Sequence, residues 1–198
     1  MLAHKQQKGF TITELLIAMA VAAIVAVGVY SFFGSSIKEY FRLQEESLAF
    51  ADVAANSQRV ASVLRGATDI TAATSSSTTV YSYFSPYDQY VSLIKYYPDN
   101  TGTKLLADVT RMTANPPIGT QISGSLKTFT IIDTFYVPGG TNTFEYLDSG
   151  GGMLAMPITD LKTIKGVRVN LAAKPPTPTS QAVKMSVEVG LRNRKTNL

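Results

Sequence analysis

A single acidic residue stands at the start of the longest apolar stretch of the chain. Glu14 is followed by Leu15 to Phe33, a run without any charged side chain. A carboxylate at the midplane of a bilayer costs about 2.5–3.5 kcal/mol and less near an interface, so such an acid usually has a partner. Glu14 is therefore a candidate contact residue whose chemistry is the pairing of a charge in an apolar setting.

Other reactive side chains are scarce. The chain has no cysteine, which excludes disulfides, thiolate metal sites, a cysteine nucleophile and lipid attachment at cysteine. The one histidine, His4, precedes the apolar stretch, so a histidine-based triad or zinc site is not available to the rest of the chain. No spaced pair of carboxylates forms a recognisable catalytic motif. We expect no enzyme activity, no cofactor and no metal site.

The apolar stretch is long enough to cross a membrane once. As a helix, Leu15 to Phe33 would extend about 28 Å, close to the ~30 Å hydrocarbon core of a bilayer. Lys5 and Lys8 precede it without any acid, which predicts a cytoplasmic N-terminal flank and an extracytoplasmic remainder. The stretch exceeds the apolar core of a secretory signal peptide, so a cleavage site is expected before it.

A long helix should carry this stretch. No proline occurs from Phe10 to about Arg65, and most residues there favour helices. We expect one continuous helix over that range, ended near Gly66. Its second half carries charges, and apolar positions at roughly helical spacing are expected to pack on a domain: Ile37, Phe41, Leu48, Ala51, Ala55 and Leu64.

The rest of the chain has the pattern of short strands separated by turns. A Ser/Thr-rich connector is expected over 68–79, and an antiparallel sheet packed against the helix should follow, which makes the fold class α+β. The expected organisation is an N-terminal flank (1–9), a membrane-spanning helix segment (10–33), the amphipathic continuation of the helix (34–66) and a β-rich extracytoplasmic domain (67–198). Strands are predicted at Thr79–Phe84, Tyr90–Tyr97, Lys104–Met112, Lys127–Val137, Thr143–Leu147, Ile164–Leu171 and Val183–Leu191.

The N-terminal motif resembles a known processing site. The segment from Lys8 to Ala18, KGFTITELLIA, is similar to that of type IV prepilins and type II secretion pseudopilins. The resemblance implies that 1–9 is a leader, which a membrane prepilin peptidase removes between Gly9 and Phe10, and that Phe10 is then N-methylated. It also implies a pilin fold, and a pairing of Glu14 with the N-terminal amine of a neighbouring subunit.

A second resemblance concerns the C-terminal half. The segments FEYLDSG at Phe144, LKTIKGVRVNL at Leu161 and VEVGLRN at Val187 are similar to minor pilins of the W type and pseudopilins of the J type. This implies a low-abundance structural subunit of a type IV pilus, competence or type II secretion filament. Its partners would be other pilin subunits and, before assembly, the lipid of the cytoplasmic membrane.

Two other functions stay open from the sequence. The sheet could serve as a filament-borne adhesin or as a DNA receptor for uptake, since the chain has ten tyrosines and a basic tail with Arg192, Arg194 and Lys195. The net charge of +4 is spread along the chain and makes no case for nucleic acid by itself. The motifs at Asp99 and at Gly150, which could suggest calcium or phosphate loops, are interpreted as turns.

Overall fold

The computed structural model describes residues 11–175 and 180–192. The chain divides into two compact units, Met1–Gln44 and Glu45–Leu198. The first is the N-terminal part of one long helix, α1 (Ile12–Arg65), and the second contains the end of that helix together with all the strands. The predicted processing residues Gly9 and Phe10 lie outside the described residues.

The bounds of α1 agree with the predicted helix, within two residues at the N-terminal end and closely at the C-terminal end. The helix begins at Ile12 rather than at Phe10 and ends at Arg65, just before Gly66. The amide of Gly66 still donates to the carbonyl of Ser62 at 3.2 Å, and the amide of Ala67 turns back to Leu64 at 3.0 Å. The chain therefore leaves the helix through a tight turn and enters the first strand directly.

The predicted packing face of the helix is largely wrong. Of the expected stripe only Leu64 is buried, whereas Ile37, Phe41, Leu48, Ala51 and Ala55 are exposed. Each helical residue turns by about 100°, so Ala51 lies on the face opposite Val53. Alanine fits either face, and the pattern did not decide between them. The residues that α1 buries are Val53, Ser57, Val60, Ala61, Val63 and Leu64.

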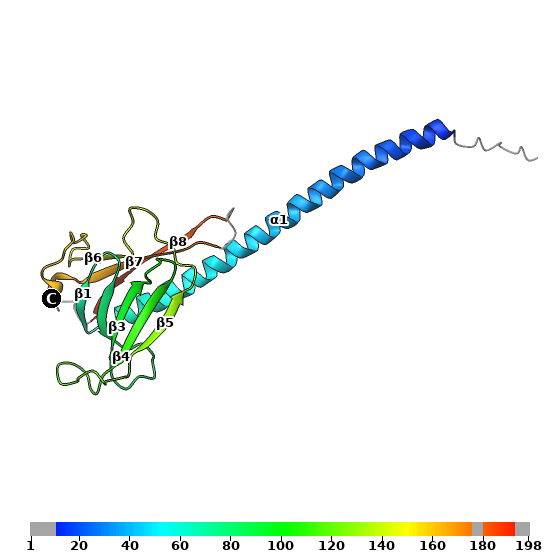
Figure 1. Cartoon of the computed structure of the whole chain (residues 1–198). Coiled ribbons are helices and arrows are strands. Elements are labelled where there is room, and N and C mark those ends of the chain that lie inside the picture. Colours follow the sequence, from blue (N-terminus) through cyan, green and yellow to red (C-terminus); the bar gives the residue numbers. More distant parts are fainter. Residues whose placement is uncertain (1–10, 176–179, 193–198) are drawn as a thin grey trace, which may run out of the picture. The chain divides into compact units, whose positions relative to one another are not determined.

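The strands form two antiparallel sheets, where a single sheet was expected (Figure 1). The first has the order of the chain and contains β1 (Asp69–Ala73), β2 (Thr78–Ser82), β3 (Ser92–Pro98), β4 (Leu105–Arg111) and β5 (Lys127–Ile132). The second contains β6 (Phe144–Leu147), β7 (Gly166–Ala173) and β8 (Val183–Gly190), and a short 3-10 helix, η1 (Leu161–Thr163), precedes β7. The α+β class, with a long helix packed on antiparallel sheets, is confirmed.

Two local expectations fail for physical reasons. The connector predicted over 68–79 contains β1, which the sequence hides because Ile70 is its only large apolar residue. Ile70 is nonetheless 2% exposed, and it pairs with Val80 of β2. The strand predicted to reach Val137 ends at Ile132, because the chain then turns at Asp133 and bridges from Phe135 to Ala173 of the second sheet.

Both sheets and the end of α1 share one core. Alternate residues of the first sheet face this core, and the cross-strand row Val80–Ile94–Val109 is buried. The hydroxyl of Ser82 donates to the carbonyl of Val63 at 2.6 Å, which fixes β2 to the helix end. The Tyr146 hydroxyl on β6 donates to carbonyls of the β1–β2 turn, so polar contacts also join the second sheet to the first.

Candidate functional site at the N-terminal helix

Glu14 takes part in a reciprocal cap at the start of α1. Its Oε2 accepts from the amide and from the hydroxyl of Thr11, both at 3.0 Å. In return, the Glu14 amide donates to the Thr11 hydroxyl oxygen at 3.3 Å. This is a capping box, in which the residue before the helix and the third helical residue satisfy each other's free amides. A carboxylate there also faces the positive end of the helix dipole.

The predicted contact residue therefore has a partner within its own chain. Sequence reasoning placed Glu14 correctly at the edge of the apolar stretch but missed this bond. The spacing of Thr11 and Glu14, Thr-x-x-Glu directly before an apolar run, is the signal that predicts a capping box. The cap orders the first turn, and it holds the carboxylate close to the backbone of Thr11, which directly follows the predicted new N-terminus.

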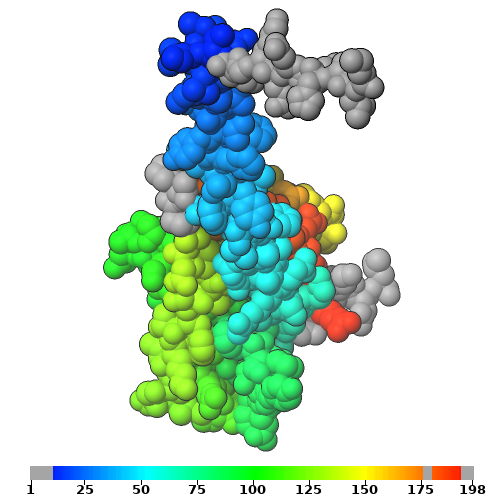
Figure 2. All heavy atoms as spheres, turned by 90° about the vertical axis from the view of Figure 1, so that its right-hand side faces the viewer, coloured from blue at the N-terminus to red at the C-terminus, as the bar shows by residue number. Residues whose placement is uncertain are grey.

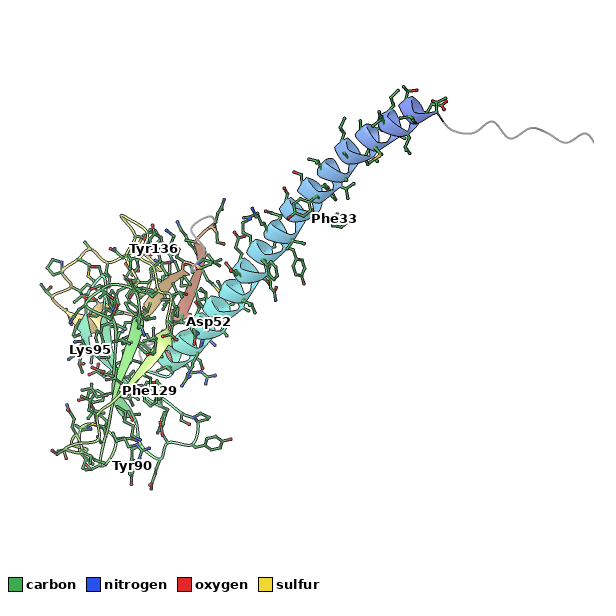
Figure 3. All side chains as sticks on the ribbon, turned by 45° about the vertical axis from the view of Figure 1, so that its right-hand side comes forward. Phe33, Asp52, Tyr90, Lys95, Phe129 and Tyr136 are labelled. Carbon is green, nitrogen blue, oxygen red and sulfur yellow. The ribbon has the colours of Figure 1, made fainter. Side chains whose placement is uncertain are left out.

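The first turns of α1 expose apolar side chains. Ile12 is 79% exposed, Ile24 73% and Phe32 69%, and Phe33 is among the side chains that line this part of α1 in Figure 3. Among the described residues, α1 is the one helix long and apolar enough to cross a membrane, judged by length and composition, and none of its most apolar window is buried. This part of the chain requires lipid or other apolar helices around it.

Two of the polar contacts on the following turns join neighbouring residues of the helix. Arg42 Nε donates to Glu39 Oε2 at 3.0 Å, and a second bond joins Arg42 Nη2 to Glu39 Oε1. The side-chain amide of Asn56 donates from Nδ2 to the Asp52 carboxylate at 2.8 Å. These pairs at spacings of three and four residues keep charge on the helix surface, which distinguishes this segment from the apolar one before it.

The two loop motifs of the sequence are turns, as expected. The carboxylate of Asp99 accepts from the Thr101 hydroxyl and from the amides of Thr103 and Lys104. The Asp148 carboxylate likewise accepts from the amides of Gly150 and Gly152 at 2.8 Å. Both acids stabilise their own loops. Within residues 11–175 and 180–192, no group of three or more histidine, cysteine or acidic residues could hold a metal ion.

Comparison with known protein families finds a match at the N-terminal motif. No curated protein matches the chain. Residues 4–30 match the family model described as the prokaryotic N-terminal methylation motif, which covers most of the predicted leader, the capping box and most of the apolar stretch. This prepilin-type motif implies processing by a prepilin peptidase and assembly with other pilin subunits. The match supports the assignment of the chain to the type IV pilin and pseudopilin family.

Proposed function

We propose that the chain is a minor, pilin-like structural subunit that enters a filament through its N-terminal helix. The observation that carries this proposal is the methylation motif over residues 4–30, continued by the exposed apolar turns of α1. A prepilin peptidase cuts between Gly9 and Phe10, and Phe10 is then N-methylated. The filament is a type IV pilus, a competence pilus or a type II secretion filament.

The proposed function assigns a role to each segment of the chain. Residues 1–9 are the leader, 10–33 cross the cytoplasmic membrane before assembly, 34–66 continue the helix and 67–198 form the extracytoplasmic domain. Assembly moves the apolar turns from lipid into a bundle of other subunits' helices, so they stay out of water throughout. Within the bundle, Glu14 pairs with the N-terminal amine of a neighbouring subunit and sets the axial register.

A minor role is supported by the long connections of the globular part. Residues 112–126 join β4 to β5, and residues 148–165, which include η1, join β6 to β7. A major pilin must present complementary faces in every repeat of the filament, whereas irregular loops are easier to accommodate once, near an end. The C-terminal segments similar to W-type pilins and J-type pseudopilins favour the same position.

Quantitative mass spectrometry of filaments sheared from the native host tests this proposal. The mature subunit should begin at methylated Phe10 and contribute a small fraction of the filament mass. A dominant species that retains residues 1–9 in the presence of active peptidase would refute the cleavage site. A chain that makes up most of the filament mass would refute the minor role and leave only the general pilin assignment.

Two variants of Glu14 separate its capping role from its role between subunits. Glutamine can keep a capping bond but carries no charge, whereas alanine keeps neither. Both Glu14→Gln and Glu14→Ala should insert into the membrane and be cleaved, because removal of the acid makes insertion easier. Both should then fail to enter sheared filaments. Normal incorporation of Glu14→Gln would show that the cap suffices and that no charge pairing is needed.

A further inference from the structure

Three residues on the core-facing side of the first sheet are exposed, although that side is otherwise largely buried. Side chains alternate along a strand, and the register continues the buried row from Val109 to Lys127 of β5. The neighbouring rows on the same face end with Phe129 and with Arg111. Two cations and an aromatic ring thus occupy positions that alternation assigns to the core. Lys127 and Phe129 are exposed, so the core packing does not extend over this corner of the sheet.

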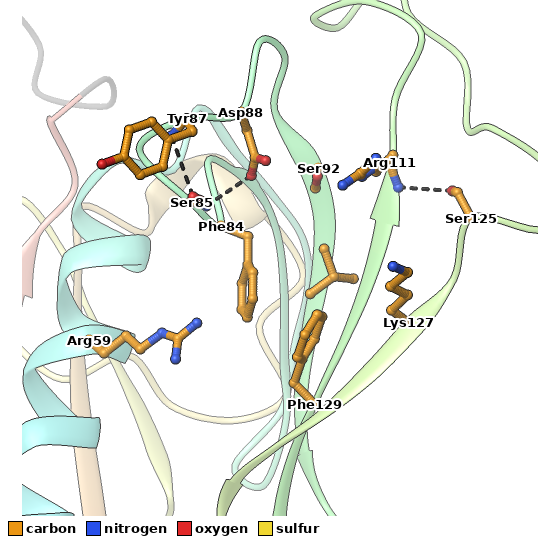
Figure 4. Close-up of a pocket in the computed structure, with 11 residues that line it drawn as sticks. Arg59, Phe84, Ser85, Tyr87, Asp88, Ser92, Arg111, Ser125, Lys127 and Phe129 are labelled. Carbon is orange, nitrogen blue, oxygen red and sulfur yellow. Dashed lines mark hydrogen bonds between the residues drawn. The ribbon is translucent and has the colours of Figure 1, made fainter.

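A groove occupies this corner. It has a volume of about 470 Å³, and Arg59 of α1 and the loop after β2 contribute to its walls. Figure 4 shows Arg59 reaching from the helix towards the Phe84 ring, with Arg111 and Lys127 on the strands opposite. In Figure 2 the cyan end of α1 and the yellow-green residues around β5 lie on one face of this unit. The groove lies entirely within the unit Glu45–Leu198.

The groove has an excess of positive charge. It is lined by Arg59, Arg111 and Lys127 and by one acid, Asp88. One carboxylate oxygen of Asp88 already accepts from the Ser85 amide at 2.9 Å. None of the ion pairs found in the described part of the chain involves any of the three cations. A hollow with uncompensated cations and low-dielectric walls attracts anions.

Aromatic rings accompany the cations. Phe84 and Phe129 stack at 4.9 Å between centroids, and the Arg59 guanidinium lies 4.9 Å from the Phe84 ring. Tyr87, which lines the groove, is 95% exposed, and Tyr90, which lines an adjoining cavity, is 37% exposed. A second cavity of about 230 Å³ adjoins the groove, shares Arg111 and Tyr87 with it, and extends past Tyr90. The surface therefore alternates cationic and aromatic groups over more than one cavity.

We propose that this groove binds single-stranded nucleic acid. Arg59, Arg111 and Lys127 contact backbone phosphates, and unstacked bases lie on the rings of Tyr87 and Tyr90. Binding is independent of base sequence, since the groove offers charges and ring faces rather than a set of free hydrogen-bonding groups. The site is separate from the N-terminal motif, so it does not depend on the proposed role in filament assembly.

An acidic polysaccharide fits these residues less well. Its hydroxyl groups would need free uncharged polar side chains, but the Ser85 hydroxyl already accepts from the Tyr87 amide at 3.4 Å. The Ser125 hydroxyl donates to the Ile122 carbonyl at 2.7 Å and accepts from the Arg111 amide at 3.0 Å. Of the basic tail that suggested DNA contact in the sequence, Arg192 does not line this groove, and Arg194 and Lys195 lie outside the described residues.

Fluorescence anisotropy with a labelled thymidine 12-mer tests the proposal on the full-length protein in an uncharged detergent. Three phosphate contacts predict a slope of log affinity against log salt of about −2, at about 0.7 per phosphate. Lys127→Gln should weaken binding about fivefold and reduce the slope by about 0.7. Lys162→Gln removes the same charge from an exposed lysine of η1, and it should change neither quantity.

Ring stacking is tested separately. Tyr87→Ala should weaken binding about fivefold or more without a change in the salt slope, and an abasic 12-mer should bind correspondingly less tightly. A duplex of the same length should bind less tightly, because its bases are not available to the rings. The proposal is overturned if the 12-mer does not bind, if Lys127→Gln and Lys162→Gln behave alike, if the abasic strand binds as tightly, or if hyaluronate binds in place of the 12-mer.

Discussion

Replacement of Tyr146 by phenylalanine should destabilise the protein at neutral pH and lose that effect in alkali. Tyr146 is 1% exposed. Its hydroxyl donates to the carbonyls of Thr74 at 3.2 Å and Ser77 at 3.0 Å, and these bonds join the second sheet to the first. Ser77 keeps its bond from the Thr74 amide when the hydroxyl is removed. We therefore expect Tyr146→Phe to lower the free energy of unfolding by about 1 kcal/mol at pH 8.

The alkaline effect follows from burial, which raises the pKa of Tyr146 from 10.0 to about 12. A raised folded-state pKa gives stability that is fully present below the unfolded value and is lost as pH rises through the folded value. The wild type should thus lose up to about 2.7 kcal/mol between pH 10 and pH 12, and about 1.4 kcal/mol of it by pH 11. Phenylalanine has no such loss, so the two proteins should be about equally stable at pH 11.

Urea unfolding of the full-length protein in an uncharged detergent, followed by circular dichroism, measures this difference. Burial also raises the pKa of Tyr96, but both proteins contain it, so its contribution cancels. Tyr87→Phe, which removes the hydroxyl from an exposed ring, is the control and should differ little from the wild type at pH 8. If the deficit of Tyr146→Phe is the same at pH 8 and pH 11, the assigned burial and bonding of this hydroxyl are wrong.

Two further predictions concern the helix packing and one turn. Leu64→Ala should lower the free energy of unfolding by about 2–5 kcal/mol because Leu64 is fully buried. Leu48→Ala, at a 65% exposed position, should lower it by less than about 0.5 kcal/mol. Urea unfolding measures both losses, and equal losses would contradict the observed helix face. The hydrogen bond from the Thr101 hydroxyl lowers the pKa of Asp99. The wild type should therefore be more stable than Asp99→Asn above about pH 4, and this advantage should decrease as pH falls below that value. A stability difference that does not change with pH would contradict the bonding of Asp99.

The features that the sequence could predict are those with a strong local signal. The helix from Phe10 to Arg65 was predicted from the absence of proline, and α1 differs from it by two residues at its described end. Strands rich in tyrosine, valine and isoleucine were also located, since alternation is visible in each of them. In contrast, the strand around Ile70 has one large apolar residue, and its pairing with β2 decides its structure.

The packing face of the helix and the groove could not be predicted, because both depend on which elements meet in space. Alanines at positions 51 and 55 suited a buried face as well as Val53 and Ser57 did, and only the sheets select between them. Likewise, Lys127 begins a strand with no local sign that its side chain continues the row of Val109.

The two candidate sites differ in how far apart their residues lie in the sequence. The N-terminal site is made by neighbours along one helix, so the spacing of Thr11 and Glu14 already contains its geometry. The groove needs Arg59 from the helix and two strand residues brought together by sheet register. A change in the register of β5 by one residue would turn Lys127 to the other face and abolish the groove, while the capping box would be unaffected. The two sites can therefore be lost independently, and assembly and nucleic-acid binding should be separable by mutation.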